Sequence, residues 1–281
     1  KAAFGRGPWW EMYGDPILDA LEKEVSCTNQ NIKVALARLD EARADLNEVR
    51  SALYPKVLGV ANMYRQQLSH NSAVASRRSQ ATNNTTVFNT LLYNDNLLIA
   101  NLYYELDVWG RVRNSVAAAK NLAQASAADV MVVALSMHAE LANDYFILRG
   151  YDEEQRILDA TVRTYQKALD LTRRRFKGGV VSVVDVDQAQ VQLDIAKTAA
   201  TDIHLQRAQV EHAIAVLIGR PPATFAIKPR HYRPKLVTIA PDLPSTLLER
   251  RPDIAEAALR MQAANANIGV AWAAFFPQIN L

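Results

Sequence analysis

Histidines, a cysteine and two nearby aspartates are the residues of this chain whose chemistry could build an active site or a metal site. The five histidines are scattered, and none stands in an HExxH pattern or beside a pair of cysteines. His204 and His212 share a predicted helix at a spacing of eight, which ordinary surface histidines satisfy equally well. Asp185 and Asp187 point in different directions on a helix, so they form no acid–base pair, and Asp185 is better placed to cap the helix. We therefore predict no catalytic residues and no metal site.

Phosphate and nucleic-acid chemistry are also not indicated. The pair Gly178-Gly179 lacks the GK[ST] or GxxG that would follow in a phosphate-binding loop. The formal net charge is only +3 and is spread evenly, which is too weak for a nucleic-acid surface. Cys27 is the single cysteine, so no disulfide can form within the chain. We expect no cofactor and no nucleic-acid partner.

The clearest predicted strand is Leu97–Trp109, in which apolar and polar residues alternate. A soluble sandwich strand would show the same alternation, but a single long hairpin with no other strands nearby must join a larger sheet. In a membrane β-barrel the apolar face meets lipid and the polar face meets the lumen. Glu105 and Asp107 would then favour cations in a pore, or else mark a solvated strand end near the membrane boundary. The apolar side carries Leu98, Ala100, Leu102, Tyr104, Leu106 and Val108, and the predicted lumen side carries Asn101, Tyr103, Glu105 and Asp107.

Two long helices joined by a glycine turn are predicted next along the chain. Residues 111–176 contain no proline and one glycine, and as a helix they would be about 100 Å long. A second helix is predicted from about Asp185 to Ile218, and a short turn makes the two antiparallel. Both carry seams with spacings of mostly three and four, as a coiled coil requires. The seams are Leu141, Tyr145, Leu148, Tyr151, Gln155, Leu158, Val162, Tyr165, Leu169, Thr172 and Phe176, then Val186, Ala189, Leu193, Ala196, Ala200, Ile203, Arg207, Val210, Ile214 and Leu217.

The turn between these helices is the candidate interaction site. The arginines before it suit the negative end of a helix dipole, which alone explains their charge. We also expect Val180, Val181 and Val183 to be exposed and to form an apolar contact surface. The predicted site comprises Arg174, Arg175, Phe176, Gly178, Gly179, Val181, Val184 and Asp185.

An internal repeat appears when the chain is shifted by 222 residues. Tyr54-Pro55-Lys56-Val57 then falls on Phe276-Pro277-Gln278-Ile279, and the Ala-rich stretches before them also align. Each copy reads as a helix that ends at aromatic-Pro and enters an extended segment. The first predicted helix runs from about Thr28 to Leu53, with Thr28 or Asn29 as N-cap, and is followed by a strand over 56–70 and a polar loop over 71–86.

The chain resembles the TolC-like outer membrane factors, and most of all their OprM/NodT branch, which serves RND-type pumps. The resemblance covers essentially the whole chain with its motifs in the family's order. They are Trp9-Trp10 with Tyr13-Gly14-Asp15-Pro16, Glu105–Arg111, Arg174–Phe176 with Gly178-Gly179 and Val184-Asp185-Val186, Leu243-Pro244-Ser245, Leu247–Ile254 and Phe275–Leu281.

The resemblance implies a mainly α fold with a membrane β-hairpin. Long α-helical coiled-coil hairpins would form a periplasmic α-barrel, and the strands would enter an outer-membrane β-barrel, 12-stranded in a homotrimer. The implied segments are 1–55, an N-terminal part with the first periplasmic helix; 56–109, the outer-membrane β-hairpin with its extracellular loop; 110–219, the long helical hairpin with the periplasmic tip; 220–252, a Pro-rich equatorial connection; and 253–281, the start of a second structural repeat.

The implied function is a passive exit duct for drugs or other small compounds, in the outer membrane of a Gram-negative bacterium. Its partners would be a periplasmic adaptor (membrane fusion) protein, an inner-membrane RND pump and outer membrane lipid. Alternatives are a duct for metal-ion efflux or type I secretion, a soluble coiled-coil interaction fragment and, least favoured, a helical-bundle enzyme. Partition of the chain into the aqueous phase without detergent would favour the soluble coiled-coil fragment.

Two departures from the family pattern bear on these expectations. The branch usually begins with an acylated cysteine, and neither that residue nor a signal peptide precedes Lys1. No apolar run of 18 residues exists, so we expect no transmembrane helix. The second departure is that the second hairpin and the second long helix of the family are missing, so that, if the chain is taken to end at Leu281, three copies would supply only about six strands, below the usual minimum of about eight. We then expect either six copies or a piece that is not inserted in a membrane.

Overall fold

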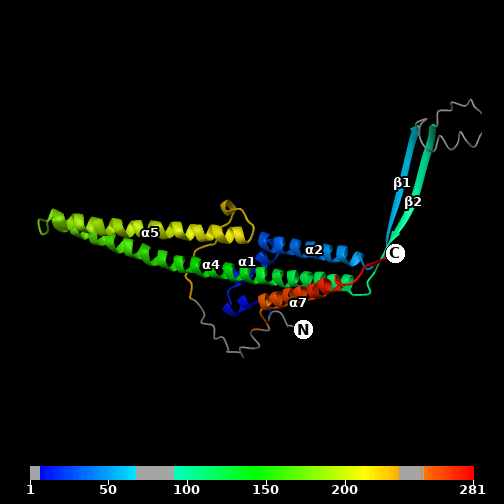
Figure 1. The fold of residues 1–281 in the computed structure, drawn as a ribbon. Coiled ribbons are helices and arrows are strands. Elements are labelled where there is room, and N and C mark those ends of the chain that lie inside the picture. Colours follow the sequence, from blue (N-terminus) through cyan, green and yellow to red (C-terminus); the bar gives the residue numbers. More distant parts are fainter. Residues whose placement is uncertain (1–6, 68–91, 234–247, 249) are drawn as a thin grey trace, which may run out of the picture. The chain divides into compact units, whose positions relative to one another are not determined.

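The computed structural model describes residues 7–67, 92–233, 248 and 250–281, whose helices and strands are drawn in Figure 1. The chain divides into two compact units. The first unit comprises Lys1–Arg43 and Asn121–Gln262, and the second comprises Ala44–Lys120 and Ala263–Leu281. The loop predicted over 71–86 lies outside the described residues, as does the end of the strand predicted over 56–70.

The long helical hairpin dominates the first unit. Helices α4 (Arg111–Lys177) and α5 (Val183–Leu217) lie side by side and antiparallel, as predicted (Figure 1). Every predicted seam position of α5 is buried or half-buried. On α4 only Tyr165 and Phe176, two of the eleven predicted positions, are exposed. The spacing of the apolar residues therefore identified the face along which the two helices pack.

The N-terminal segment adds a short 3-10 helix, η1 (Trp9–Tyr13), and a helix, α1 (Pro16–Thr28). The helix predicted over about Thr28–Leu53 corresponds to α2 (Gln30–Ser51), whereas α1, which precedes it and is separated from it at Asn29, was not predicted. Local sequence explains α1. The Asp15 side chain accepts a hydrogen bond from the Ile17 backbone N–H at 3.0 Å, and proline occupies the first helical position.

The core of the first unit forms where α1 packs with α4 and α5. Helix α1 buries a row of apolar residues at helical spacing, and α4 and α5 supply the facing residues. Trp10, from η1, extends this core and is only 9% exposed. The N-terminal segment is therefore an integral part of the hairpin's packing. The core residues include Leu18, Leu21, Val25, Leu141, Tyr145, Leu148, Ile214, Leu217 and Ile218.

Asn29 joins two helix ends with one side chain. Its Oδ1 accepts a hydrogen bond from the Ile32 backbone N–H at 3.1 Å, which caps the start of α2 and confirms Asn29 as N-cap. Its Nδ2 donates to the Leu217 carbonyl at the end of α5 at 2.9 Å. Gly219 ends α5 with a φ of 69°, and a Cβ there would lie 3.2 Å from the Thr28 carbonyl oxygen. The close approach of the two ends therefore requires both residues.

We expect Asn29→Asp to destabilise the first unit. The carboxylate would still cap α2, but it cannot donate to the Leu217 carbonyl and would place a negative charge at the negative end of the α5 dipole. The expected loss in the free energy of unfolding is about 1–3 kcal/mol. Asn29→Ser, which keeps only the cap, should lose about 1 kcal/mol. Urea denaturation followed by circular dichroism measures both.

Asn47→Asp is the matched control, because Asn47 is exposed on the same helix α2. Its unfolding free energy should stay within about 0.5 kcal/mol of the unchanged protein. Equal stability of Asn29→Asp and the unchanged protein would show that the bond to Leu217 contributes nothing.

The second unit contains an antiparallel hairpin of β1 (Lys56–Gln67) and β2 (Leu92–Tyr103). The register pairs Val57 with Leu102 and Ala61 with Leu98, so these residues share one face. Leu58 pairs with Asn101 on the other face, which also carries Val60 and Ile99 and is therefore less polar than predicted. The strand predicted over Leu97–Trp109 extends further back, to Leu92, and is interrupted at Tyr104.

A second, shorter pairing brings Ile279–Leu281 beside the residues that follow β2. Strand β3 (Glu105–Leu106) pairs antiparallel with β4 (Ile279–Asn280), and Tyr104 and Leu281 exchange two backbone hydrogen bonds of 3.2 and 2.8 Å. Trp109 stacks on Phe276 at 4.4 Å and donates from Nε1 to the Pro277 carbonyl at 3.0 Å. Residues 107–109, expected in the strand, instead lead into α4.

Helix α7 (Pro252–Ala273) confirms the internal repeat at the level of structure. A shift of 222 residues places the bounds of α2, 30 and 51, on 252 and 273. Between α5 and α7, the described residues 220–233 contain one 3-10 helix, η2 (Pro222–Thr224), and otherwise irregular chain. The remainder of that proline-rich segment, 234–247 and 249, lies outside the described residues.

One helix corrects the expectation about membrane spans. Among the described residues, α4 contains an 18-residue window apolar enough to cross a membrane by length and composition, and 22% of that window is buried. An uninterrupted apolar run ends at any charged residue. The mean hydropathy of this Ala-rich window, in contrast, stays high with one or two charged residues. Only the length and composition of the window support a membrane span. Helix α4 as a whole, at about 100 Å, is about three times as long as a bilayer core is thick.

Candidate functional site: the hairpin tip and a buried ionic network

The predicted tip is built by an ordered helix end. Gly179 has a φ of 74° and donates to the Phe176 carbonyl at 2.9 Å, while Val180 donates to the Arg175 carbonyl at 3.0 Å. These two bonds form a Schellman motif, which ends a helix at a residue that must adopt the left-handed conformation. Glycine is the residue that adopts it without strain. The turn at Gly178-Gly179 is thus a rigid helix stop.

A capping box starts α5 immediately after the turn. Ser182 is the N-cap, and its backbone N–H donates to Asp185 Oδ2 at 2.8 Å, while the Asp185 N–H donates to Ser182 Oγ at 3.4 Å. The sequence predicted that Asp185 caps this helix. It does take part, but as the third helical residue of the box, with Ser182 in the cap position.

The residues of the tip surround an open groove of about 810 Å³. Val180, Val183 and Val184 are exposed, as an apolar contact surface requires. Val181 is half-buried, contrary to the expected exposure, because it lies against the groove wall. The groove lining includes Thr172, Arg175, Val181, Val184, Asp185 and Gln188. The groove therefore brings together four of the eight predicted tip residues, whereas Arg174, Phe176 and the two glycines do not line it and Arg174 and Phe176 are exposed.

The four predicted lumen residues divide into two pairs. Asn101 and Tyr103 lie on one face of β2 and are half-buried and exposed, respectively. Glu105 accepts a hydrogen bond from Arg111 Nε at 2.8 Å. Asp107 accepts from the backbone N–H groups of Val112 and Arg113 at 3.0 and 2.9 Å, so it caps α4. Both carboxylates thus stabilise the start of α4, whether or not they also face a lumen.

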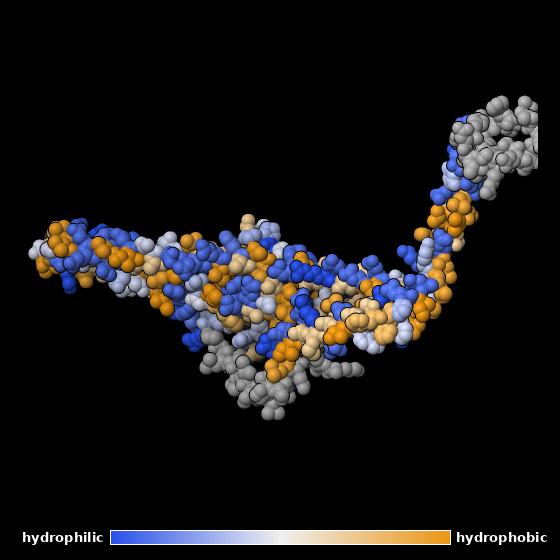
Figure 2. All heavy atoms as spheres, viewed as in Figure 1, coloured by the Kyte–Doolittle hydropathy of each residue, from blue (hydrophilic) through white to orange (hydrophobic). Residues whose placement is uncertain are grey.

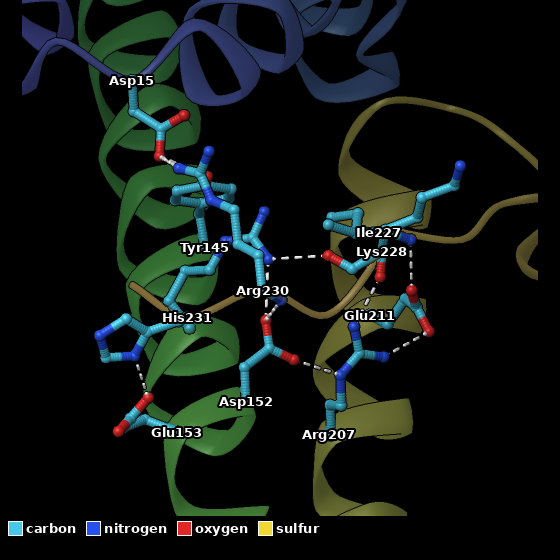
Figure 3. Close-up of polar contacts among 11 residues, drawn as sticks. Asp15, Tyr145, Asp152, Glu153, Arg207, Glu211, Ile227, Lys228, Arg230 and His231 are labelled. Atoms are coloured by element: carbon cyan, nitrogen blue, oxygen red, sulfur yellow. Dashed lines mark hydrogen bonds and ion pairs between the residues drawn. The ribbon is translucent and has the colours of Figure 1, made fainter. Parts of the chain in front are cut away.

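A buried ionic network, absent from the sequence-based prediction, holds α4 to α5 (Figure 3). Asp152 is 7% exposed and accepts from Arg149 Nη1 at 2.8 Å and from Arg207 Nε at 2.7 Å. Arg149 is 1% exposed and also lies over the Tyr145 ring at 4.8 Å. Glu211 accepts from Arg207 Nη1 at 3.2 Å. Charged groups this deeply buried remain ionised only when they are paired.

The same arginines hold the chain that follows η2. Arg207 Nη2 donates to the Ile227 carbonyl at 2.6 Å, and Arg149 Nη1 donates to the Lys228 carbonyl at 3.1 Å. The Ile227 N–H donates in turn to Glu211 (Figure 3). A segment without regular structure therefore has its backbone groups satisfied by buried side chains of α4 and α5.

Arg230 extends the network to the N-terminal segment. It forms an ion pair with Asp15, and the Tyr145 hydroxyl donates to the same carboxylate, at Asp15 Oδ2, at 2.6 Å (Figure 3). Burial, with the hydrogen bond to Asp15 next, raises the pKa of the Tyr145 hydroxyl to about 12. Tyr145 therefore stays protonated at neutral pH. Three arginines face three carboxylates, those of Asp15, Asp152 and Glu211, so the network carries no net charge.

The network is suited to holding structure rather than to catalysis. Each of its carboxylates is paired with an arginine, so none is free to act as a general base. Among the described residues, no group of three or more histidines, cysteines or acids could hold a metal ion. The one sequence signal for the network is Arg207, which occupies a seam position otherwise filled by apolar residues.

A protein-family comparison matches the chain in two blocks. The model described as outer membrane efflux protein matches residues 21–220 and 243–281. The Toluene efflux pump outer membrane protein TtgC of Pseudomonas putida is 32% identical over 274 residues, which are 97% of this chain and 54% of that protein. The Pyoverdine export outer membrane protein OpmQ of Pseudomonas aeruginosa is 28% identical, over 97% of this chain and 56% of its own. The chain thus spans about half the length of the curated relatives it matches.

Solved structures give the same result for the fold. The outer-membrane channel OprN superposes with a TM-score of 0.81 at 27% identity, covering 100% of this chain and 61% of that chain. The outer membrane protein VceC of Vibrio cholerae superposes with a TM-score of 0.80 at 24% identity, covering 97% and 62%. These matches confirm the mainly α, TolC-like fold that the sequence predicted.

The family model covers the helical hairpin, the strands of the second unit and the start of the repeat, which together are well over half of the chain. The predicted resemblance to TolC-like outer membrane factors is therefore confirmed, and the chain belongs to the outer membrane efflux protein family, a family with a transport role.

Proposed function

We propose that this chain forms part of a passive exit duct of a tripartite RND-type efflux system in the outer membrane of a Gram-negative bacterium. The duct carries drugs or other small compounds, and the pump selects them. The partners are a periplasmic adaptor protein, an inner-membrane RND pump, outer membrane lipid and two further copies of the chain. The observation that carries the proposal is the long α4–α5 hairpin with a rigid, apolar tip, in a chain of this family.

A second seam on α5 supports assembly with further copies. Apolar residues recur along α5 on a side that does not face α4, and each is more than half exposed. Such a stripe on a helix of a folded chain favours contact with another helix. A groove of about 640 Å³ lies along it, between Val191 and Asp202. We assign this stripe to contacts with the neighbouring copy in a homotrimer. Its apolar members are Val184, Val191, Ile195, Leu205 and Val216.

The β1–β2 hairpin supports a place in the membrane. A two-stranded sheet is only marginally stable alone and needs further strands. Leu98 and Met63 are both 84% exposed, and apolar side chains gather along the hairpin (Figure 2). In the proposed barrel of 12 strands, the face of Val57, Leu98 and Leu102 meets lipid. Asn101, Tyr103, Glu105 and Asp107 then lie toward the lumen.

The tip is the proposed contact for the adaptor. Val180, Val183 and Val184 are 54–75% exposed, which favours an apolar contact, and Figure 2 shows hydrophobic residues among hydrophilic ones at this end of the α4–α5 hairpin. The neighbouring Arg174 and Arg175 would meet acidic or carbonyl groups of the partner. Because the Gly178-Gly179 stop is rigid, opening of the duct is proposed to move whole helix pairs around this turn.

Crosslinking of neighbouring tips tests this proposal. Full-length protein with Cys27→Ser and Val184→Cys is expressed in cells that lack the native protein, and a bifunctional maleimide joins the copies. We expect export of a fluorescent pump substrate to fall to the level of cells without the protein, because joined tips cannot separate. Substrate accumulation in the cells measures export, and gel mobility measures crosslinking.

Gln209→Cys in the same Cys27→Ser background is the control, because Gln209 is exposed on α5 far from the tip. Its crosslinking should leave export unchanged. Full crosslinking at Val184 with undiminished export would contradict the role of the tip.

A further inference from the structure

A buried glutamate and histidine lie between the N-terminal clasp, Trp9–Thr28, and helix α4. Glu22 on α1 has no exposed surface, and its Oε2 lies 2.6 Å from His138 Nδ1 on α4. The other oxygen, Oε1, is buried and has no hydrogen-bond partner in the described structure. The Trp10 ring of η1 stacks on the His138 ring at 4.6 Å and 25°. The pair thus sits where all three elements meet.

The hydrogen bonds around this pair define its protons. The Ser26 hydroxyl donates to the Glu22 backbone carbonyl at 3.2 Å, so its proton is used, and its lone pairs face His138 Nε2 at 3.3 Å. Nε2 must then carry a hydrogen that it donates to Ser26. At Nδ1, a distance of 2.6 Å to a carboxylate oxygen requires one proton between the two atoms. The arrangement therefore holds one shared proton, and with it no net charge.

Few other charges act on this pair. On α1, Asp19 is the charged neighbour of Glu22, and on α4 it is His138 itself, while η1 contributes the uncharged Trp10. Burial is the main cause that raises the pKa of the Glu22 carboxyl, and Asp19 adds to it, against the lowering effect of His138. Among the residues that the structure describes, no cation other than His138 is in a position to neutralise Glu22 once the shared proton is lost.

We propose that the Glu22–His138 pair is a one-proton lock that fixes the N-terminal clasp to α4 and releases it when the shared proton leaves. Removal of that proton strands a carboxylate in the core, with one oxygen already lacking a partner. The clasp then opens locally, which exposes Trp10 and the apolar side of α1. Addition of a second proton strands a cation in the same place, so strong acid also weakens the lock.

Proton linkage gives the direction in which docking of the clasp changes with pH. A carboxyl whose pKa is raised by folding keeps a proton that it has lost in the unfolded chain, so the stability that it adds is lost as pH rises through the folded value. In an unfolded chain, carboxyls titrate at about 4.3 and imidazoles at about 6.5. Docking of the clasp is therefore strongest between these values. Above pH 6.5 it weakens by up to about tenfold per pH unit until the proton is lost.

Hydrogen exchange of the full-length protein tests the lock. Exchange is measured by mass spectrometry between pH 5.5 and 8.5 and corrected for the intrinsic rate at each pH. We expect protection of peptides within 9–28 to fall about tenfold or more from pH 6.5 to 8.5. Peptides from residues 186–203 of α5 serve as the internal reference and should keep their protection.

Two variants separate the lock from a general effect of pH. Glu22→Gln cannot ionise and should keep the clasp protected at pH 8.5, so that its pH dependence disappears. Glu11→Gln is the matched control, because Glu11 is exposed on η1, and it should behave as the unchanged protein. A pH dependence that survives in Glu22→Gln overturns the proposal. If that variant does not fold, a flat pH profile of the unchanged protein overturns it equally.

Discussion

Asp152→Asn is expected to lower the free energy of unfolding of the first unit by about 3–5 kcal/mol. The substitution keeps the volume of the side chain and removes the carboxylate that contacts both Arg149 and Arg207. The side chain of Arg149 has no exposed surface and that of Arg207 is 10% exposed, so water cannot replace the lost partner. Chemical denaturation followed by circular dichroism measures the change.

Two further variants of the chain serve as controls for this prediction. Asp159 lies two turns further along α4, is exposed and accepts a hydrogen bond from the uncharged Gln155, so Asp159→Asn should change stability by less than about 0.5 kcal/mol. The double variant Arg149→Met, Asp152→Asn removes one stranded charge with its partner. It should be more stable than Asp152→Asn alone, and simple additivity of the two losses would contradict the buried-charge explanation.

The hairpin could be predicted from sequence because its signals are local and repetitive. A proline-free run predicted α4, regular spacing predicted the seam, and Gly178-Gly179 predicted the stop. Strands β1 and β2 were found for the same reason, through alternation and Pro55. The strand end was misplaced at Trp109 because alternation continues past Tyr104, where the pairing partner changes from β1 to β4. Such a change of partner leaves no local signal.

The ionic network could not be predicted because it joins residues that are distant in sequence. Asp15 and Arg230 are 215 positions apart, and Asp152 and Arg207 are 55 apart. An arginine in a helical sequence is usually a solvated residue, and its burial is decided by what packs over it. Only Arg207, in a seam of apolar residues, indicated a buried partner. The one-proton lock is similar, since Glu22 and His138 each read as an ordinary surface residue.

Helix α1 is a different case, because its signals were present. Asp15 followed by Pro16 is a typical helix start, and Leu18, Leu21 and Val25 recur at spacings of three and four. Charged residues lie between these apolar positions, so the segment was interpreted as charged and its apolar side was not recognised. The structure buries that side completely at Leu18 and Val25.

Leu18→Ala is therefore expected to cost about 2–5 kcal/mol of unfolding free energy, the range for a fully buried leucine whose cavity does not collapse. Leu18 has no exposed surface and packs in the core with residues of α4 and α5, so its loss affects the hairpin and not only the N-terminal segment. Urea denaturation monitored by helical circular dichroism measures this. If α1 were an independent appendage, only its own small helical signal would disappear, and the midpoint of the main transition would not move.

Leu205→Ala supplies the matched comparison, since Leu205 is 57% exposed on α5. In the isolated monomer its cost should be below about 0.5 kcal/mol, because little apolar surface is uncovered. In the assembled protein the same substitution should weaken association between copies, because Leu205 belongs to the second seam. A loss of monomer stability at Leu205 equal to that at Leu18 would contradict the division of α5 into an inner face that supports the fold and an outer face that supports assembly.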